Sequence, residues 1–303
     1  MQQTAKHILA FRIATRRLGG SLSCNGSPFL AIAVLLLASA AFAAPTPQQK
    51  SAERPEMDAN QLAKEVVQNE LNAETSDQTL WRYRETIQQG GTAQVLEVVE
   101  TKQGEIHRLL EMDGKPLNAT QAQAEDDRIR KLLSDPKQFQ EQQKDRAQDA
   151  RQERTLLRML PEAFLFQYDG TKENLVGLKF TPNPNFHPSD REGAVFHHME
   201  GTIWVDPGQK RLAEIDGRLT TEVKFWGGLL GHLDKGGTFS VKQEDLGSGH
   251  WEMTSLNVQM DGKALFFKTI AVREREVYSN FEPLPDGTTL KKAAEILKVD
   301  TSS

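Results

Sequence analysis

Apolar residues recur at a spacing of three or four positions in a few stretches of the chain, and this pattern predicts helices. The clearest case is 57–74, where Leu62, Val66 and Leu71 fall on one face behind a capping aspartate or asparagine. A short helix is predicted at 289–297, at the end of the chain. Each of these helices has one apolar face, so we expect both to pack on another layer.

Most of the remaining chain alternates apolar and polar residues between glycine-rich turns, which predicts antiparallel strands joined by hairpins. About ten strands are expected, at 80–88, 92–101, 105–112, 164–168, 175–181, 195–206, 211–225, 238–244, 250–260 and 263–275. The last two are separated by a predicted turn at Asp261-Gly262. A sheet of this size curls, and its apolar face must be covered. The fold class is therefore α+β: a large curved antiparallel sheet, or half-barrel, covered by the helices at 57–74 and 289–297 and the apolar segment near Leu156.

A charged segment at 119–160 interrupts the strands and predicts a helical insertion. It contains two predicted helices, 119–133 and 135–160, with Pro136 at the first position of the second. The middle of the second helix, QEQQKDRAQDARQER, has only Ala147 and Ala150 as apolar residues. A helix that is polar all round is exposed, bridges other elements, or is marginally stable. The apolar heptads of a coiled coil are missing.

The first 43 residues predict a secretory signal peptide. Basic residues precede an uncharged apolar run, PFLAIAVLLLASAAFA, which ends in the small-x-small pattern Ala41-Phe42-Ala43. We expect cleavage after Ala43, a disordered leader at 44–56, and a single domain at 57–303. The mature chain is expected to be exported to the bacterial periplasm without spanning the membrane, since no later stretch has the length of a transmembrane helix.

Charge and cysteine content narrow the function of the mature chain. Four positive charges lie in the signal peptide, so its removal takes the net charge from −5 to −9. An acidic protein is not expected to bind nucleic acid or anionic lipid surfaces, because both are polyanionic. The one cysteine, Cys24, also lies in the signal peptide. The mature chain therefore has no disulfide and no thiol chemistry.

No motif in the sequence predicts catalysis, a metal site or a cofactor. Adjacent histidines such as His197 and His198 point to opposite faces of a strand and cannot chelate together. Ser248 lies in a Gly-Ser-Gly hairpin turn without the context of a nucleophile elbow. Lys235 precedes Gly236 in the order opposite to that of a phosphate-binding loop. We therefore expect a protein that is not an enzyme and binds no cofactor, while a hydrolase without a recognisable motif remains an alternative.

The segment FWGGLLGHLDKGG, at 225–237, combines five glycines with large apolar side chains. One interpretation is a core segment followed by a connection that the glycines allow to turn tightly. The other is an apolar lid over the mouth of the curled sheet, enclosing a hydrophobic ligand. The candidate ligand-binding residues are Phe225, Trp226, Leu229 and Leu230 in the lid and Trp204, Trp251 and Phe267 in the wall or rim.

The run that begins FTPNPNFHPSDREG at 180 and continues to about 285 resembles a group of uncharacterised exported bacterial proteins. The element order over 57–285 is similar to that of the Lol-type lipoprotein carriers and receptors. This resemblance implies a curved half-barrel with a helical lid and a hydrophobic cavity for lipid chains. It assigns no functional residue, and the helices at 119–160 depart from the Lol-type plan.

The leading prediction is non-enzymatic binding or transport of a hydrophobic or lipid-like ligand in the cell envelope. A cavity of several hundred Å³ with apolar walls is typical of such proteins. The alternative is a protein-interaction module that binds an envelope protein through exposed helices at 119–160. A buried triple of histidine, carboxylate and nucleophile would favour the hydrolase instead.

Overall fold

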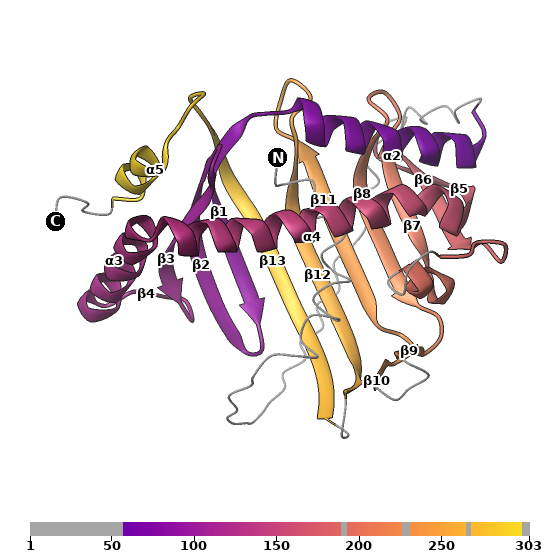
Figure 1. Cartoon of the computed structure of the whole chain (residues 1–303). Coiled ribbons are helices and arrows are strands. Elements are labelled where there is room, and N and C mark those ends of the chain that lie inside the picture. Colours follow the sequence, from indigo (N-terminus) through magenta and orange to yellow (C-terminus); the bar gives the residue numbers. More distant parts are fainter. Residues whose placement is uncertain (1–56, 189–192, 226–230, 265–267, 299–303) are drawn as a thin grey trace, which may run out of the picture.

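The computed structural model describes residues 57–188, 193–225, 231–264 and 268–298 (Figure 1). The helices are α2 (Ala59–Ser76), α3 (Ala119–Ser134), α4 (Pro136–Ala163), α5 (Leu290–Ile296) and the 3-10 helix η3 (Gly193–His198). The strands are β1 (Leu80–Gln89), β2 (Thr92–Thr101), β3 (Gly104–Met112), β4 (Lys115–Pro116), β5 (Phe164–Lys172), β6 (Leu175–Pro182), β7 (Met199–Asp206), β8 (Arg211–Leu219), β9 (Val223–Phe225), β10 (Gly231–Leu233), β11 (Thr238–Asp245), β12 (Trp251–Ala264) and β13 (Lys268–Leu284).

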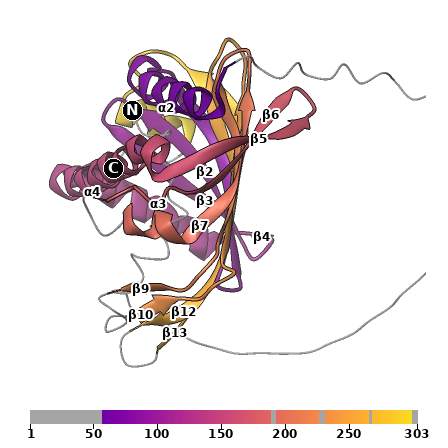
Figure 2. The same cartoon turned by 90° about the vertical axis from the view of Figure 1, so that its right-hand side faces the viewer.

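These strands form one antiparallel sheet with the order β4-β3-β2-β1-β13-β12-β11-β8-β7-β6-β5, and β10 and β9 continue from the far half of β12. Both ends of this order remain as edges, so the sheet is not closed into a barrel. Figure 2 shows the sheet from its side, with α2, α3 and α4 on one face, which we call the inner face. The predicted α+β curved sheet is confirmed, with thirteen strands in place of about ten.

The predicted turn at Asp261-Gly262 is wrong, because β12 runs straight through both residues to Ala264. Gly262 serves a close approach of two strands and not a turn. A Cβ atom at this position would lie 2.2 Å from the carbonyl oxygen of His232 in β10. A glycine can mark a turn or, within a strand, a close approach of another backbone, and sequence alone does not distinguish these two roles.

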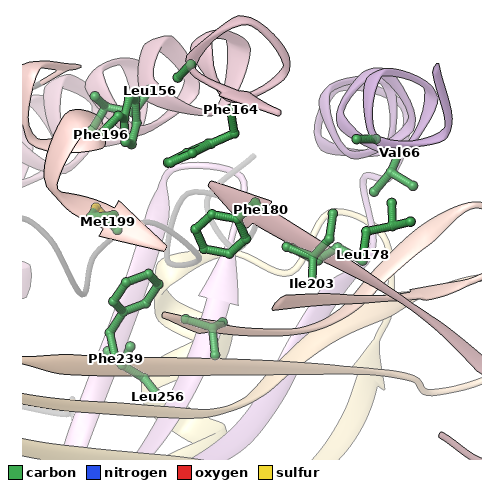
Figure 3. Close-up of a cluster of buried hydrophobic side chains, with 14 of the residues drawn as sticks. Val66, Leu156, Phe164, Leu178, Phe180, Phe196, Met199, Ile203, Phe239 and Leu256 are labelled. Carbon is green, nitrogen blue, oxygen red and sulfur yellow. The ribbon is translucent and has the colours of Figure 1, made fainter. Parts of the chain in front are cut away.

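The main hydrophobic core lies on the inner face, chiefly over β5 to β12, and extends to Tyr83 of β1, Val98 of β2 and Tyr278 of β13. Figure 3 shows side chains from α2, α4 and the sheet packed against one another, with Phe180 at the centre. The Phe180 ring lies 4.7 Å from the Phe164 ring, centroid to centroid. Along one row of paired residues, Phe180 and Phe239 flank Gly201 and Gly217. A Cβ at Gly217 would lie 2.2 Å from the Phe239 ring, so the ring occupies the space over the glycine.

Buried acidic side chains enter the inner face at β13, among apolar ones such as Val272 and Tyr278. A second row of paired residues runs Leu178, Ile203, Ile215, Val241, Leu256, Glu276, Ile87 and Gln94. Glu274 and Glu276 of β13 are both buried on this face, whereas Arg273 and Arg275 are exposed on the other. The predicted apolar face is present, but buried glutamates on β13 interrupt it.

Helix α4 crosses the inner face from one end of the sheet to the other (Figure 1). The apolar and polar segments of α4 match the side chains of the strands that they contact. Phe139 near its start and Leu156 near its end are buried in the two hydrophobic clusters. Between them, Arg146 lies 2.6 Å from Glu105 of β3. The interpretation of this polar segment as a bridge is confirmed, because both ends are anchored and the middle contacts charged strands. In the described residues the helices lie on the sheet and do not project as an arm.

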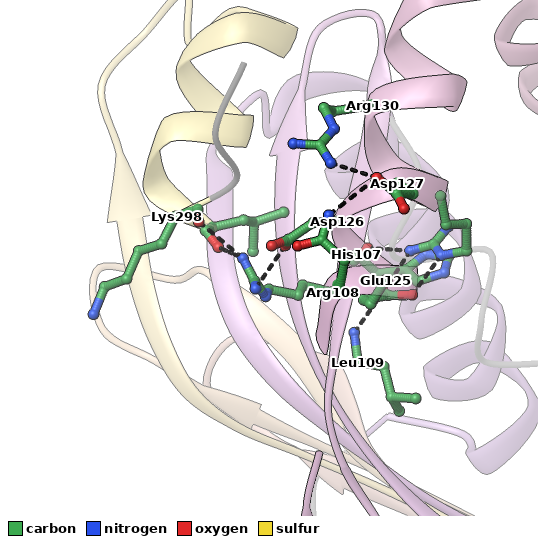
Figure 4. A network of polar contacts seen from close by, with 11 residues as sticks. His107, Arg108, Leu109, Glu125, Asp126, Asp127, Arg130 and Lys298 are labelled. Atoms are coloured by element: carbon green, nitrogen blue, oxygen red, sulfur yellow. Dashed lines mark hydrogen bonds and ion pairs between the residues drawn. The ribbon is translucent and has the colours of Figure 1, made fainter. Parts of the chain in front are cut away.

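Helix α3 covers the edge of β3, where backbone groups would otherwise lack partners (Figure 4). The backbone N–H of Leu109 donates to Glu125 over 2.8 Å, and the Arg128 guanidinium donates to the His107 carbonyl over 2.7 Å. Burial would raise the pKa of Glu125, but hydrogen bonds from Arg128 and the Leu109 N–H lower it. Arg108 connects β3 to the end of α5, because its guanidinium donates to the Leu297 carbonyl over 2.6 Å. The helical insertion therefore closes one edge of the sheet.

Candidate functional site

The structure places three of the seven residues predicted to bind ligand within described strands. Trp226, Leu229, Leu230 and Phe267 lie outside the described residues. Phe225 is the last residue of β9 and pairs with Gly231, which pairs with Ala264, which pairs with Lys268. The strand ends that flank 226–230 and 265–267 therefore align in one row, a relation that the sequence does not reveal.

The remaining two candidates, Trp204 and Trp251, lie on different parts of the sheet. Trp204 is on the face opposite the core residue Ile203, where the Lys172 ammonium lies 5.5 Å from its ring. Trp251 is half-buried at the start of β12, and its indole N–H donates to the Gln209 side chain over 3.0 Å. The structure does not bring Trp204 and Trp251 together.

A groove lies where the connection between α2 and β1 meets the turn between β11 and β12. It has a volume of about 790 Å³ and is open to solvent. Its apolar wall is made of Trp81, Leu246, Val277, Phe281 and Pro283. We call this the junction groove. A concave site with apolar walls and a few polar groups is the usual form of a small-molecule site.

A β-bulge in the pairing of β1 with β13 shapes the junction groove. Arg82 pairs with Glu282, but Arg84 pairs with Ser279, so two residues of β13, Asn280 and Phe281, lie opposite the single residue Tyr83. One of them, Asn280, has φ of 56°, a left-handed conformation that asparagine tolerates better than most residues. The bulge brings Phe281 against the aromatic residues of β1: its ring stacks on Tyr83 at 5.4 Å and meets Trp81 edge-on at 6.0 Å.

A polar pair at the rim of the groove ties the two chain segments together. His250 Nδ1 lies 2.7 Å from the Asp77 carboxylate, and the backbone N–H of Thr79 donates to the same carboxylate over 2.9 Å. Asp77 follows the last turn of α2, and its own N–H donates to the Ala73 carbonyl. The end of α2 and the β11–β12 turn, about 170 residues apart in sequence, are thus joined by a charge-assisted contact.

This pair is not arranged as a catalytic triad. In a triad, the carboxylate bonds to one imidazole nitrogen and the nucleophile bonds to the other. The hydroxyl of Thr79 lies 3.3 Å from His250 Nδ1, the nitrogen that already faces Asp77. Within the described ranges, no group of three or more histidine, cysteine or acidic residues is placed to hold a metal ion.

Burial alone would raise the pKa of Asp77, but the hydrogen bonds from His250 and Thr79 hold it below the ordinary value of 3.8. A lowered carboxyl pKa stabilises the fold above the unfolded-state pKa, and this stabilisation is lost as the pH falls through the lower folded-state pKa. We therefore expect Asp77→Asn to reduce the unfolding free energy at pH 6, and the deficit to shrink as the pH falls below about 4. Urea unfolding of wild type and Asp77→Asn at several pH values measures this deficit in unfolding free energy.

The control for this titration is Asp286→Asn, since Asp286 is exposed. It should show little deficit at any pH. An Asp77→Asn deficit that stays constant from pH 6 to the acid limit of folding would contradict the assignment.

Sequence reasoning missed the residues that make this site. Trp81 lies in the predicted strand at 80–88 but was not among the candidate residues, and neither were Asp77, His250 and Phe281. Each is an ordinary residue in its local pattern, and only the pairing of β1 with β13 and the fold of the β11–β12 turn bring them together. In the parts of the chain that the structure describes, no helix combines the length and apolar character needed to cross a bilayer.

The chain was compared with known proteins. No family model matches it, and no curated protein matches it. Among solved structures, it is similar to a DUF1329 family protein from Desulfovibrio piger ATCC 29098, with a TM-score of 0.25 and 9% sequence identity. That match covers 77% of this chain and 97% of the other. At this TM-score the likeness supports no conclusion about fold or function, and nothing in the comparisons confirms a Lol-type relationship.

Proposed function

We propose that this is a non-enzymatic binding protein of the bacterial cell envelope, exported by the signal peptide at 1–43, that takes a hydrophobic or amphiphilic small molecule in the junction groove. The observation that carries the proposal is the groove itself: about 790 Å³ of open volume beside Trp81, Val277 and Phe281. Burying apolar ligand surface there would contribute about 25 cal/mol per Å².

The position of the ligand differs from that implied by the Lol-type resemblance. In that plan, lipid chains lie within the half-barrel. Here the apolar part of the inner face is covered by packed side chains such as Phe180, Phe196 and Leu256 (Figure 3). Protein interiors pack at the density of organic crystals, so a ligand would have to displace this core to enter. A ligand can occupy the junction groove without displacing side chains of the core.

The polar rim supports an amphiphilic ligand over a purely hydrocarbon one. Lys242, Glu244 and Arg275 line the same groove as the apolar wall. These side chains come from β11 and β13, which flank β12, so they can contact a polar group while the apolar part lies against Phe281. A few polar groups beside an apolar wall fix the orientation of a ligand.

Fluorescence titration with N-phenyl-1-naphthylamine, a neutral apolar probe, tests the proposal on protein purified from the periplasm of an expressing bacterium. Its intact mass should correspond to a chain that begins at Ala44. We expect saturable binding, weakened about tenfold by Val277→Glu, because this change places a carboxylate on the apolar wall. The matched control is Leu165→Asp, which adds a carboxylate at an exposed leucine of β5, away from the groove.

Equal loss of probe binding in both variants would indicate non-specific surface binding and would reject the junction groove. Unchanged binding in Val277→Glu would do the same. A fluorescent fatty acid, displaced by the neutral probe from wild-type protein, would show that both occupy one site.

A further inference from the structure

A second cavity shares Trp81 with the junction groove and is lined by residues of α2, the β2–β3 turn and the middle of α4. Its volume is about 360 Å³, and it is more enclosed than the junction groove. Trp81 and Trp251 contribute flat aromatic walls, and Gln143 of α4 reaches it from above. The position that a Cβ atom would take at Gly104 is 2.2 Å from the Gln143 carboxamide, so this side chain lies directly against the β2–β3 turn. We call this the tryptophan pocket.

Three buried carboxylates, those of Glu74, Glu100 and Glu252, line the tryptophan pocket. Glu74 is held by Arg154 through two hydrogen bonds of 2.6 and 2.9 Å. Glu100 accepts the backbone N–H of Trp81 over 3.0 Å. An ionised carboxylate has about four acceptor positions, so accepting one or two hydrogen bonds within the protein does not prevent it from accepting another from a ligand.

The same pocket also has hydrogen-bond donors. Arg211 lines it, held in place by Glu70 at 2.8 Å and lying 5.6 Å from the Trp251 ring. The indole N–H of Trp81 is buried and has no hydrogen-bond partner among the described residues. A buried donor without a partner costs about 1–3 kcal/mol, and such a group in a native structure calls for an explanation.

Acceptors and donors in one enclosed pocket discriminate between classes of ligand. A simple cation would satisfy the carboxylates and leave the Trp81 N–H without an acceptor. A simple anion would satisfy the N–H and Arg211 but meet three carboxylates at close range. A hydroxyl group donates and accepts at the same time. A neutral polyhydroxylated molecule can therefore satisfy both sets, with its C–H surface against the indole rings.

We propose that the tryptophan pocket binds a saccharide unit, with the Trp81 N–H donating to one of its hydroxyls and Glu252 and Glu100 accepting from others. This inference is independent of the apolar ligand proposed for the junction groove. The volume of about 360 Å³ is at the lower end of small-molecule sites, which suits one or two sugar rings. A free sugar and the sugar headgroup of a glycolipid share this chemistry.

Isothermal titration and saturation-transfer NMR with glucose, galactose, N-acetylglucosamine and their disaccharides test the proposal on the mature protein. At least one sugar should bind saturably, and Trp81→Phe, which keeps an aromatic ring and removes the N–H, should weaken it about 2- to 10-fold. Glu252→Gln, which keeps the shape, should weaken it by a similar factor. The matched control is Glu141→Gln, since Glu141 is exposed on α4 and lines neither cavity.

A second arm distinguishes the two sources of sugar. Co-sedimentation with phosphatidylcholine vesicles, with and without galactosyl diacylglycerol, should show binding that depends on the glycolipid if the headgroup is the ligand, whereas free sugar alone binds if it is not. Binding of the neutral naphthylamine probe to Glu252→Gln should match wild type, so failure here is separable from failure of the junction groove.

Three results would overturn the proposal. The first is the absence of saturable binding of any sugar or glycolipid vesicle to wild-type protein. The second is equal weakening by Glu141→Gln. The third is saturable binding of tetramethylammonium at the pocket in place of sugars, which would assign the pocket to a cation. Thermal unfolding of each variant, expected within a few degrees of wild type, excludes misfolding as the cause of lost binding.

Discussion

Replacing Arg211 with methionine is expected to lower the free energy of unfolding by about 3–5 kcal/mol, one of the two largest effects in this protein. Arg211 donates to the buried Glu70 through Nε and a terminal nitrogen at 2.8 and 3.1 Å. The Leu212 N–H donates to the same carboxylate over 2.9 Å. The Glu70 side chain is 1% exposed, so removing Arg211 leaves a buried charge without its counter-ion. Urea denaturation, with an unchanged m-value, measures the loss.

Two controls test the reason for this loss. The double variant Glu70→Leu/Arg211→Met should lose less than Arg211→Met alone, because the unpaired charge is removed together with its partner. Arg218→Met breaks the exposed pair with Glu200, in which the arginine side chain is 66% exposed, and should cost at most about 1 kcal/mol. A loss for Arg211→Met as small as that for Arg218→Met would show that the Glu70 pair does not hold α2 on the sheet.

The second large effect is expected for Phe180→Ala, at about 3–5 kcal/mol. Phe180 is 2% exposed and lies against Phe164 and over Gly201. Its removal leaves a cavity that the surrounding strands cannot collapse to fill, since the backbone of β7 is fixed by pairing on both sides. Calorimetric or urea unfolding of wild type and Phe180→Ala gives the difference in unfolding free energy.

Leu165→Ala in β5 is the matched control, because Leu165 is 46% exposed and belongs to the same β5–β6 hairpin as Phe180. It should change the unfolding free energy by no more than about 0.5 kcal/mol. If Phe180→Ala lost no more than this control, the packing in Figure 3 would not be the main source of stability.

Several local features of the fold could be predicted from sequence, because they arise from neighbouring residues. The capping of α2 by Asp58, whose carboxylate accepts from two backbone N–H groups, follows from Asp-x-Asn before an apolar period. The boundary between α3 and α4 follows from Asp135-Pro136. The alternation predicted strands at 195–206 and 211–225, and these are confirmed over β7 and β8; the bounds are wrong where 193–198 form η3 and where the second strand ends at Leu219 before β9. Helical and strand periods are local properties of the chain.

The same local reasoning failed where a residue has two structural meanings. Asp261-Gly262 has the composition of a hairpin turn, yet it lies within β12 because β10 passes close to Gly262. The Arg-Glu-Arg-Glu run at 273–276 has no apolar residue, so its pattern does not show which face is buried. The structure buries Glu274 and Glu276 and exposes the arginines. Strand pairing, and not composition, decides which face an alternating strand turns inward.

The sequence by itself determined the α+β class, the antiparallel pairing of successive strands, the charged helical insertion and the expectation of export, because each depends on residues close together in the chain. Only the tertiary structure placed Trp81 in the walls of two cavities, joined Asp77 to His250 and set the middle of α4 against charged strands. These relations depend on the register between segments up to about 200 residues apart, such as Leu80 with Leu284. Such registers are set by the packing of the whole sheet, and no short stretch of sequence encodes them.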